Sequence, residues 1–236
     1  AQLGWRAMFG GLAVLGLVTA VTIALLVGDR RAAPRISLAS FGQVLRQRAA
    51  AWAIGMSVCH MAAQFSLFAL VAPFLQERFS LPAAQVSLAL LVGGMSGVAG
   101  NLLAGRIGDR LGAARSLQLT VIGMACASAA LLLLPGAAWL GIAVYATWSL
   151  AGMGFYAPQQ KRLIGLAPDL RNLLLAMNAS ALYIGMSLGA AAGSRAWDAL
   201  GAWSLPAVAL VFIGCSLATF VLSRRAEQAA GGTVSG

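Results

Sequence analysis

Gly100–Arg115 reads G-N-L-L-A-G-R-I-G-D-R-L-G-A-A-R and lies between two long apolar stretches. The segment contains three arginines, one aspartate and four glycines. Charged residues are costly inside a bilayer, so a short charged interruption between apolar stretches marks a connection at a membrane surface. We therefore predict a tight polar loop that joins two membrane helices, with Asp109 and Arg110 at the turn and glycines allowing close backbone approach.

The composition of the whole chain agrees with a membrane protein. Of its 236 residues, 60% are apolar and only 9% are charged, whereas a soluble domain carries about 25% charged residues. A helix needs about 20 apolar residues to cross the hydrocarbon core. Seven stretches meet this requirement, and the predicted fold is an all-α membrane protein with spans at Ala7–Val27, Ala51–Leu75, Ala83–Leu103, Leu117–Leu134, Ala138–Tyr156, Leu173–Gly193 and Trp203–Leu222.

The net charge of +10 follows this topology. Thirteen of the 16 basic residues fall on one side of the alternating layout: Arg30, Arg31, Arg35, Arg46, Arg48, Arg106, Arg110, Arg115, Lys161, Arg162, Arg171, Arg224 and Arg225. The positive-inside rule places that side, with the C-terminus, in the cytoplasm. The expected partner of the chain is therefore the lipid bilayer and not a nucleic acid, which would require a basic soluble face.

The connectors divide the chain unevenly. The longest polar connector, 29–49, separates a single span within 1–28 from a block of six spans within 50–223, and a short cytoplasmic tail, 224–236, follows. Three plus three spans make the second triplet inverted relative to the first, an arrangement typical of secondary transporters. We expect the block to be a C-terminal half and the first span to be the last helix of a missing N-terminal half.

The charged segment resembles the signature loop of the major facilitator superfamily, G-x-x-x-D-R-x-G-x-x-[RK]. Gly105, Asp109, Arg110, Gly112 and Arg115 match it, while Ala113 stands where the family usually has a basic residue. The position of the segment resembles the second copy of that loop, so the chain would comprise helices six to twelve. Further stretches are similar to the sugar-efflux-like and drug:proton antiporter branch, namely 72–75, 100–103 and 177–183.

The resemblance implies that the segment is a conformational switch made by Gly105, Arg106, Gly108, Asp109, Arg110, Gly112 and Arg115. In such a switch, Asp109 would meet the positive N-terminus of a helix from the other half and break away when that face opens. Two plainer interpretations stay open. The charges can act as a topology signal alone, or Asp109 can form a local cluster with Arg106 and Arg110.

Polar residues within spans are the best indicators of a solute pathway. The resemblance places spans two, three, five and six around a central cavity, and the candidate lining residues are His60, Gln64, Tyr145, Trp148, Asn178 and Tyr183. The alternative role is hydrogen bonding between helices, which contributes only about 0.6 kcal/mol on average in membranes. Glycines at 93, 97 and 100 and at 185, 189 and 193 predict close helix packing.

Proton coupling is implied by the branch alone. His60 is the only histidine, and its imidazole can change charge near neutral pH, yet a lone imidazole in a span is more often a neutral hydrogen-bonding group. None of the six acidic residues falls deep inside a span. If protons drive transport, we expect the essential carboxylate in the missing half.

Other function classes have weaker support. Gly94–Gly97 matches the G-x-S-G of intramembrane serine proteases, but no histidine follows residue 60 to act as the general base. No cofactor or metal motif is recognised, and the three cysteines lie in separate spans. The resemblance to the superfamily branch implies a transporter that exports a small organic solute, a sugar or drug-like molecule, from the cytoplasm across a bacterial inner membrane. An uptake permease and a non-transporting scaffold or sensor stay open.

Overall fold

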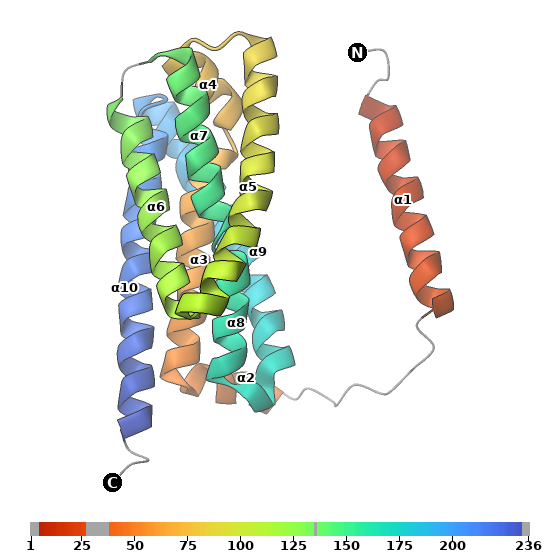
Figure 1. Cartoon of the computed structure of the whole chain (residues 1–236), viewed down its shortest axis with the longest axis vertical. Coiled ribbons are helices and arrows are strands. Elements are labelled where there is room, and N and C mark those ends of the chain that lie inside the picture. Colours follow the sequence, from red (N-terminus) through yellow and green to blue (C-terminus); the bar gives the residue numbers. More distant parts are fainter. Residues whose placement is uncertain (1–4, 27–37, 135, 233–236) are drawn as a thin grey trace. The chain divides into compact units, whose positions relative to one another are not determined.

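The computed structural model describes residues 5–26, 38–134 and 136–232 of the chain, all but a few of them in helices (Figure 1). Contacts between Cα atoms divide the chain into two compact units, Ala1–Ile36 and Ser37–Gly236. The first unit contains one helix, α1 (Trp5–Leu26). The second unit contains the remaining helices and the hydrophobic core.

Seven helical segments of the described residues are long and apolar enough to cross a membrane, which confirms the predicted all-α membrane fold. They are α1, α3 (Arg48–Phe68), α5 (Ala83–Leu111), α6 (Ala113–Leu133), α7 (Ala138–Met153) continued by α8 (Tyr156–Leu166), α9 (Arg171–Leu200) and α10 (Ser204–Gly232). Three short elements lie between them: α2 (Leu38–Arg46), α4 (Val71–Phe79) and the 3₁₀ turn Pro168–Leu170.

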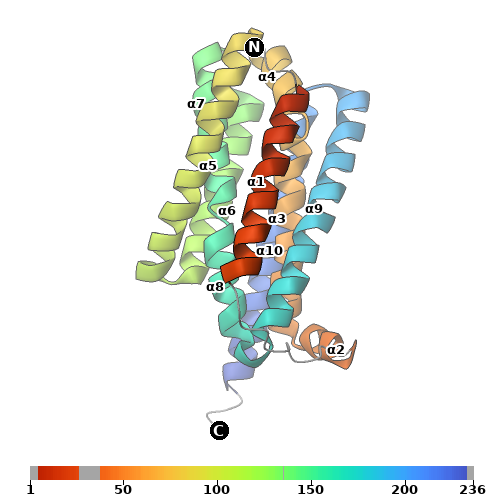
Figure 2. The same cartoon turned by 90° about the vertical axis from the view of Figure 1, so that its right-hand side faces the viewer.

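The second unit has two groups of helices (Figures 1 and 2). In one group α3 packs along both α9 and α10, and in the other α7 packs along α5 and α6. Helix α8 connects the groups, since it contacts α5 and α6 as well as α3 and α9. Each group therefore combines helices from both predicted triplets, so neither triplet forms a separate bundle.

Three predicted boundaries were wrong. The stretch Ala51–Leu75 is not one helix, because α3 ends at Phe68 and α4 begins at Val71, with Pro73 in its first turn where a missing N–H is tolerated. The predicted polar loop Gly100–Arg115 is almost entirely helical, since α5 continues through Leu111 and α6 begins at Ala113. Helix α10 also continues beyond Leu222 into the segment predicted as a tail.

Glycine stripes bring the helices of each group close together, as predicted from their spacing. On α9, a Cβ added at Gly185, Gly189 or Gly193 would collide with the α3 backbone at Val58, Ala62 or Ser66. On α5, the stripe at 93, 97 and 100 is covered by side chains and backbone of α7. This contact is the small-residue packing that lets two membrane helices approach closely.

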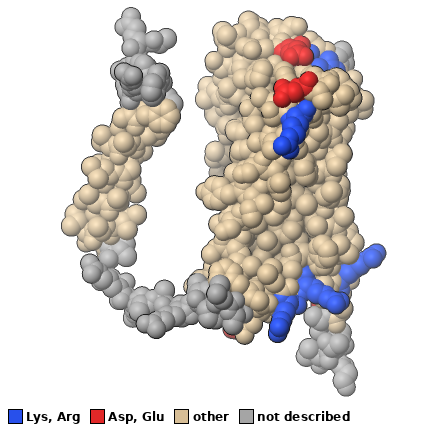
Figure 3. All heavy atoms as spheres, turned by 180° about the vertical axis from the view of Figure 1, so that it is seen from behind, with Lys and Arg blue, Asp and Glu red and all other residues tan. Residues whose placement is uncertain are grey.

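Charged side chains gather at the two ends of the second unit on the face seen in Figure 3, and the wide middle zone of that face carries none. This pattern fits a bundle whose middle lies in hydrocarbon and whose ends meet water. At one end Arg78 donates hydrogen bonds to the carbonyl oxygens of Leu132 (3.4 Å) and Leu134 (2.8 Å), which terminate α6.

Candidate functional site

A single residue separates α5 from α6 in the predicted switch segment. Gly112 has φ +88° and ψ 149°, a backbone conformation that side-chain-bearing residues rarely adopt. Across this turn the Ser116 hydroxyl donates a 2.7 Å hydrogen bond to the carbonyl oxygen of Ala104. The turn is therefore shorter and better defined than the loop predicted from its glycines and charges.

Asp109 pairs with a residue far away in the sequence. Its Oδ1 lies 2.7 Å from Nζ of Lys161, which is on α8, and the same ammonium is 3.5 Å from the carbonyl oxygen of Gly108. Both side chains stay exposed, by 71% for Asp109 and 52% for Lys161. The described structure shows no ion pair from Asp109 to Arg106 or Arg110, although all three lie at the end of α5, so the local-cluster interpretation stays open.

The glycines of the segment hold α5 against its neighbours. Gly108 is buried, and a Cβ there would be in contact with the side chains of Pro158 and Ser116, each at 3.7 Å. Gly105 faces Ala157 at the same distance. The arginines at 106, 110 and 115 are exposed. The segment therefore has a packed face toward α8 and a charged face toward solvent.

A buried hydrogen-bond network joins α3, α8 and α9. The Ser57 hydroxyl donates to Oδ1 of Asn178 (2.6 Å), and Nε2 of Gln159 donates to Oγ of Ser57 (2.9 Å) and to the carbonyl oxygen of Ala53 (2.7 Å). All three polar side chains are at most 3% exposed. Asn178 therefore has an interhelical partner, in agreement with the alternative role considered for the candidate cavity residues.

His60 and Gln64 lie one helical turn apart on α3 and face α7. The His60 ring stacks on Phe155 with a centroid distance of 3.9 Å, and its Nε2 lies 3.0 Å from the carbonyl oxygen of Gly152. Both residues are at most 1% exposed. His60 Nδ1 and Gln64 Oε1 have no hydrogen-bond partner among the described residues. Each side chain thus keeps an unused polar atom within the bundle.

The three candidate aromatic residues occupy different environments. Trp148 is fully buried and its indole N–H donates to Oγ of Ser128 at 3.1 Å. Tyr145 is 2% exposed and covers Gly93 of α5. Tyr183, in contrast, is 70% exposed on α9. The six candidates therefore do not form one cluster, and their place at a solute cavity stays a prediction.

A small pocket lies between α5 and the junction of α7 with α8. Its volume is about 170 Å³, and it is lined by Gly94, Gly97, Val98, Asn101, Met153 and Tyr156. Oδ1 of Asn101 accepts a 3.2 Å hydrogen bond from the backbone N–H of Ala157, and the Tyr156 hydroxyl donates to Sδ of Met61. Asn101 was missing from the predicted cavity, because it precedes the charged segment and draws attention only as part of that motif.

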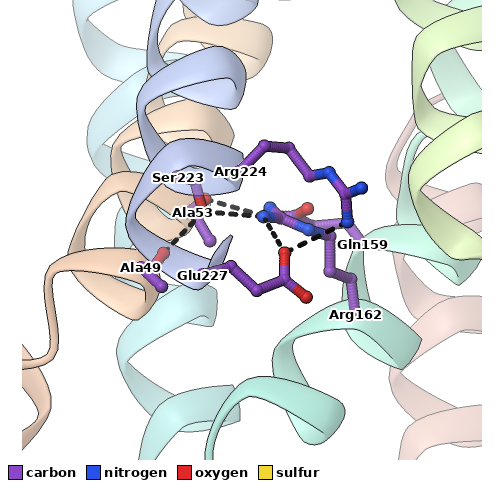
Figure 4. A network of polar contacts seen from close by, with 7 residues as sticks. All are labelled: Ala49, Ala53, Gln159, Arg162, Ser223, Arg224 and Glu227. Carbon is purple, nitrogen blue, oxygen red and sulfur yellow. Dashed lines mark hydrogen bonds and ion pairs between the residues drawn. The ribbon is translucent and has the colours of Figure 1, made fainter. Parts of the chain in front are cut away.

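Arg162 was counted among the basic residues between the fifth and sixth predicted spans. In the structure it lies on α8 and belongs to a buried network (Figure 4). Its side chain is 4% exposed. Nη2 donates to Oγ of Ser223 (2.7 Å) and lies 3.4 Å from Oε2 of Glu227, while the Ser223 hydroxyl donates to the carbonyl oxygen of Ala49 (2.6 Å). Three helices, α3, α8 and α10, are thereby tied together.

These features define a multi-pass α-helical membrane protein. It has two groups of packed helices and a charged, glycine-containing turn at one end. The sequence model of the Major Facilitator Superfamily matches residues 1–190 of the chain. The chain therefore belongs to the Major Facilitator Superfamily, whose members are secondary transporters rather than enzymes.

Proposed function

We propose that the chain forms part of a secondary active transporter that moves a small organic solute across the bilayer by alternating access. The observation that carries this proposal is the family match over residues 1–190. The contact between α5 and α8 at Asp109 and Lys161 supports it, because it provides a charge pair at the end of the bundle where a switch is expected.

The proposed switch depends on the ion pair of Asp109 with Lys161 being exposed to solvent and therefore weak. Exposed ion pairs contribute only about 0–1 kcal/mol, so the pair of Asp109 with Lys161 can break and reform at little cost. We infer that Asp109 exchanges between Lys161 and a helix N-terminus in the other half of the transporter. Gly112 would permit the one-residue turn between α5 and α6, because its positive-φ conformation disfavours other residues.

The proposed solute path runs along α3, α5, α7–α8 and α9. The pocket beside Asn101 and Tyr156 supports this assignment, since an uncharged lining with an amide and a phenol suits a neutral or weakly polar solute. The candidates at 60, 64, 145, 148, 178 and 183 belong to three of these four spans, α3, α7 and α9. Movement of these helices against the other half would change which of them meet the solute.

Export coupled to protons is the favoured direction and driving force, and it rests on the branch resemblance. The distribution of basic residues supports a cytoplasmic C-terminus, and the bacterial inner membrane is the proposed location. An uptake permease or a scaffold that transports nothing would have the same helices, so flux must separate these functions.

The test compares two carboxylates at the same end of the bundle. Asp109→Asn removes the acidic member of the proposed switch, while Asp169→Asn removes an exposed carboxylate for which the described structure shows no ion pair. The natural full-length protein is reconstituted in vesicles with a trapped pH-sensitive dye. A pentose, a thioglycoside and ethidium are then offered as solutes across an imposed pH gradient.

We expect at least one solute to drive proton movement faster than in empty vesicles, with protons moving in the direction opposite to the solute. Asp109→Asn is expected to slow this flux at least tenfold with normal insertion, whereas Asp169→Asn stays within twofold of wild type. Equal flux for Asp109→Asn and Asp169→Asn would contradict the role of Asp109 in the switch. Movement of solute and protons in the same direction would identify an uptake permease. No flux with any solute would favour a scaffold that transports nothing.

A further inference from the structure

The end of the bundle that carries the start of α3 and the end of α10 encloses a basic pocket. Its volume is about 710 Å³, and its lining includes Arg46, Arg48, Trp52, Leu166, Leu222 and Arg225. These residues come from the α2–α3 junction, α8 and α10. The pocket is much larger than the one beside Asn101 and shares no residue with it.

The charge of this pocket is positive and uncompensated among the described residues. Three arginines line it and no carboxylate does. The nearest carboxylate along α10, Glu227, is engaged by Arg162 and by Arg224, at 3.4 Å and 3.2 Å. The described structure shows no ion pair for Arg46, Arg48 or Arg225, so no described carboxylate neutralises the arginines of this pocket.

The backbone adds to this positive potential. Helix α3 begins at Arg48, and its N-cap residue Gln47 makes no side-chain hydrogen bond to the first turn. Both residues line the pocket. Free N–H groups at a helix N-terminus favour an anion, and arginine binds phosphate through two parallel hydrogen bonds. The expected ligand group is therefore a phosphate.

The helices that line the pocket favour a lipid over a soluble anion. Arg48 begins one helix that is long and apolar enough to cross a membrane, and Leu222 and Arg225 belong to another, Ser204–Ala229. Trp52, 41% exposed, is one turn into its span, where an indole commonly meets the headgroup region. Leu166 and Leu222 give the pocket an apolar side that a glycerol backbone and acyl chain can cover.

We propose that this pocket binds the phosphate headgroup of an anionic phospholipid from the leaflet at this end of the bundle. Basic pockets between transmembrane helices bind such headgroups in other membrane proteins. The pocket adjoins the Arg162 network, because Ala49 lines the pocket and its carbonyl oxygen accepts the hydrogen bond of Ser223. A bound lipid would thus hold α3, α8 and α10 together beside the contact that Arg162 makes.

The test measures lipid binding to the purified full chain in detergent by native mass spectrometry. Phosphatidylglycerol is titrated against wild type, Arg48→Gln/Arg225→Gln and the control Arg115→Gln/Arg171→Gln. The control removes two exposed arginines outside the pocket lining. An arginine near an anionic lipid surface contributes about 1 kcal/mol, or about fivefold in affinity. The pocket variant should therefore bind about 30-fold more weakly, and the control should stay within twofold.

Two further comparisons keep the proposal falsifiable. Arg48→Lys/Arg225→Lys retains the charge and should bind within about fivefold of wild type, which separates charge loss from misfolding. Phosphatidylcholine should bind at least tenfold more weakly than phosphatidylglycerol. Equal losses in pocket and control variants would overturn the proposal, as would equal binding of the two lipids. Displacement of the lipid by an equimolar amount of inorganic phosphate would also overturn it, in favour of a soluble anion.

Discussion

Replacing Gly189 of α9 by alanine is expected to destabilise the bundle by about 1–3 kcal/mol, the usual cost of overpacking a close contact. An added Cβ would overlap the carbonyl oxygen of Ala62 and lie 2.7 Å from its Cα. These are backbone atoms, so no side-chain rotation can relieve the clash. Ordinary contact at 3.4–4 Å requires α3 and α9 to separate by about 1 Å, and a gap of that size forfeits up to half of each dispersion contact.

The matched control is Gly214→Ala on α10. Gly214 is exposed and no atom lies within 4 Å of an added Cβ, so alanine there brings only its higher helix propensity, a gain of up to about 1 kcal/mol. Both variants are unfolded reversibly in mixed micelles with increasing dodecyl sulfate, and tryptophan fluorescence reports the transition. Equal stability of the two variants, or a more stable Gly189→Ala protein, would refute the reasoning about the α3–α9 contact.

Two further substitutions test the packing of the site, each with its own control. Ser57→Ala should cost about 1–3 kcal/mol in the same unfolding assay, because it leaves the buried Oδ1 of Asn178 without its donor and removes one of the two hydrogen bonds of Gln159 Nε2. Ser180→Ala, which loses only a hydrogen bond within its own helix, should cost about 0.6 kcal/mol or less. Gly112→Ala should cost about 1–3 kcal/mol through its positive φ, whereas Gly165→Ala, in open space within α8, should cost nothing or stabilise by up to about 1 kcal/mol. Equal losses within either pair would contradict the assigned contacts.

The membrane spans were predictable from the sequence because the constraint that creates them is local. A run of about 20 apolar residues is itself the signal of a membrane helix, and all seven predicted spans overlap helices of that kind. The glycine stripes were predictable for the same reason, since their spacing places them on one helix face. The spacing did not predict which helix packs against each glycine stripe. The structure shows that α3 packs against the stripe of α9.

The switch segment shows where the sequence signal was misleading. Charges and glycines predicted a loop, yet Arg106, Asp109 and Arg110 continue α5, and only Gly112 has a conformation that interrupts the helix. Arginine is compatible with a helix, and beyond the membrane its charge costs little. The charged segment thus lies at the junction of two candidate membrane helices, as predicted, while its local structure is helix and not loop.

Long-range polar contacts could not be predicted from one sequence. Lys161 and Arg162 are neighbours, and both were assigned to a connector as topology signals. In the structure Lys161 forms an ion pair with Asp109, and Arg162 is buried against Ser223 and Glu227 of α10. The two side chains leave α8 in different directions, and the partner of each depends on tertiary packing that no local pattern describes.

Alternating access is tested most directly by cysteine accessibility, which needs no known solute. The native cysteines at 59, 126 and 215 are replaced by serine, and a single cysteine is introduced at Asn101, beside the small pocket, or at Val211, an exposed position on α10. A membrane-impermeant maleimide is applied from the cytoplasmic side. Breaking the switch with Asp109→Asn should increase labelling at position 101 several-fold and leave position 211 unchanged, whereas equal labelling at position 101 with and without Asp109 would contradict the account.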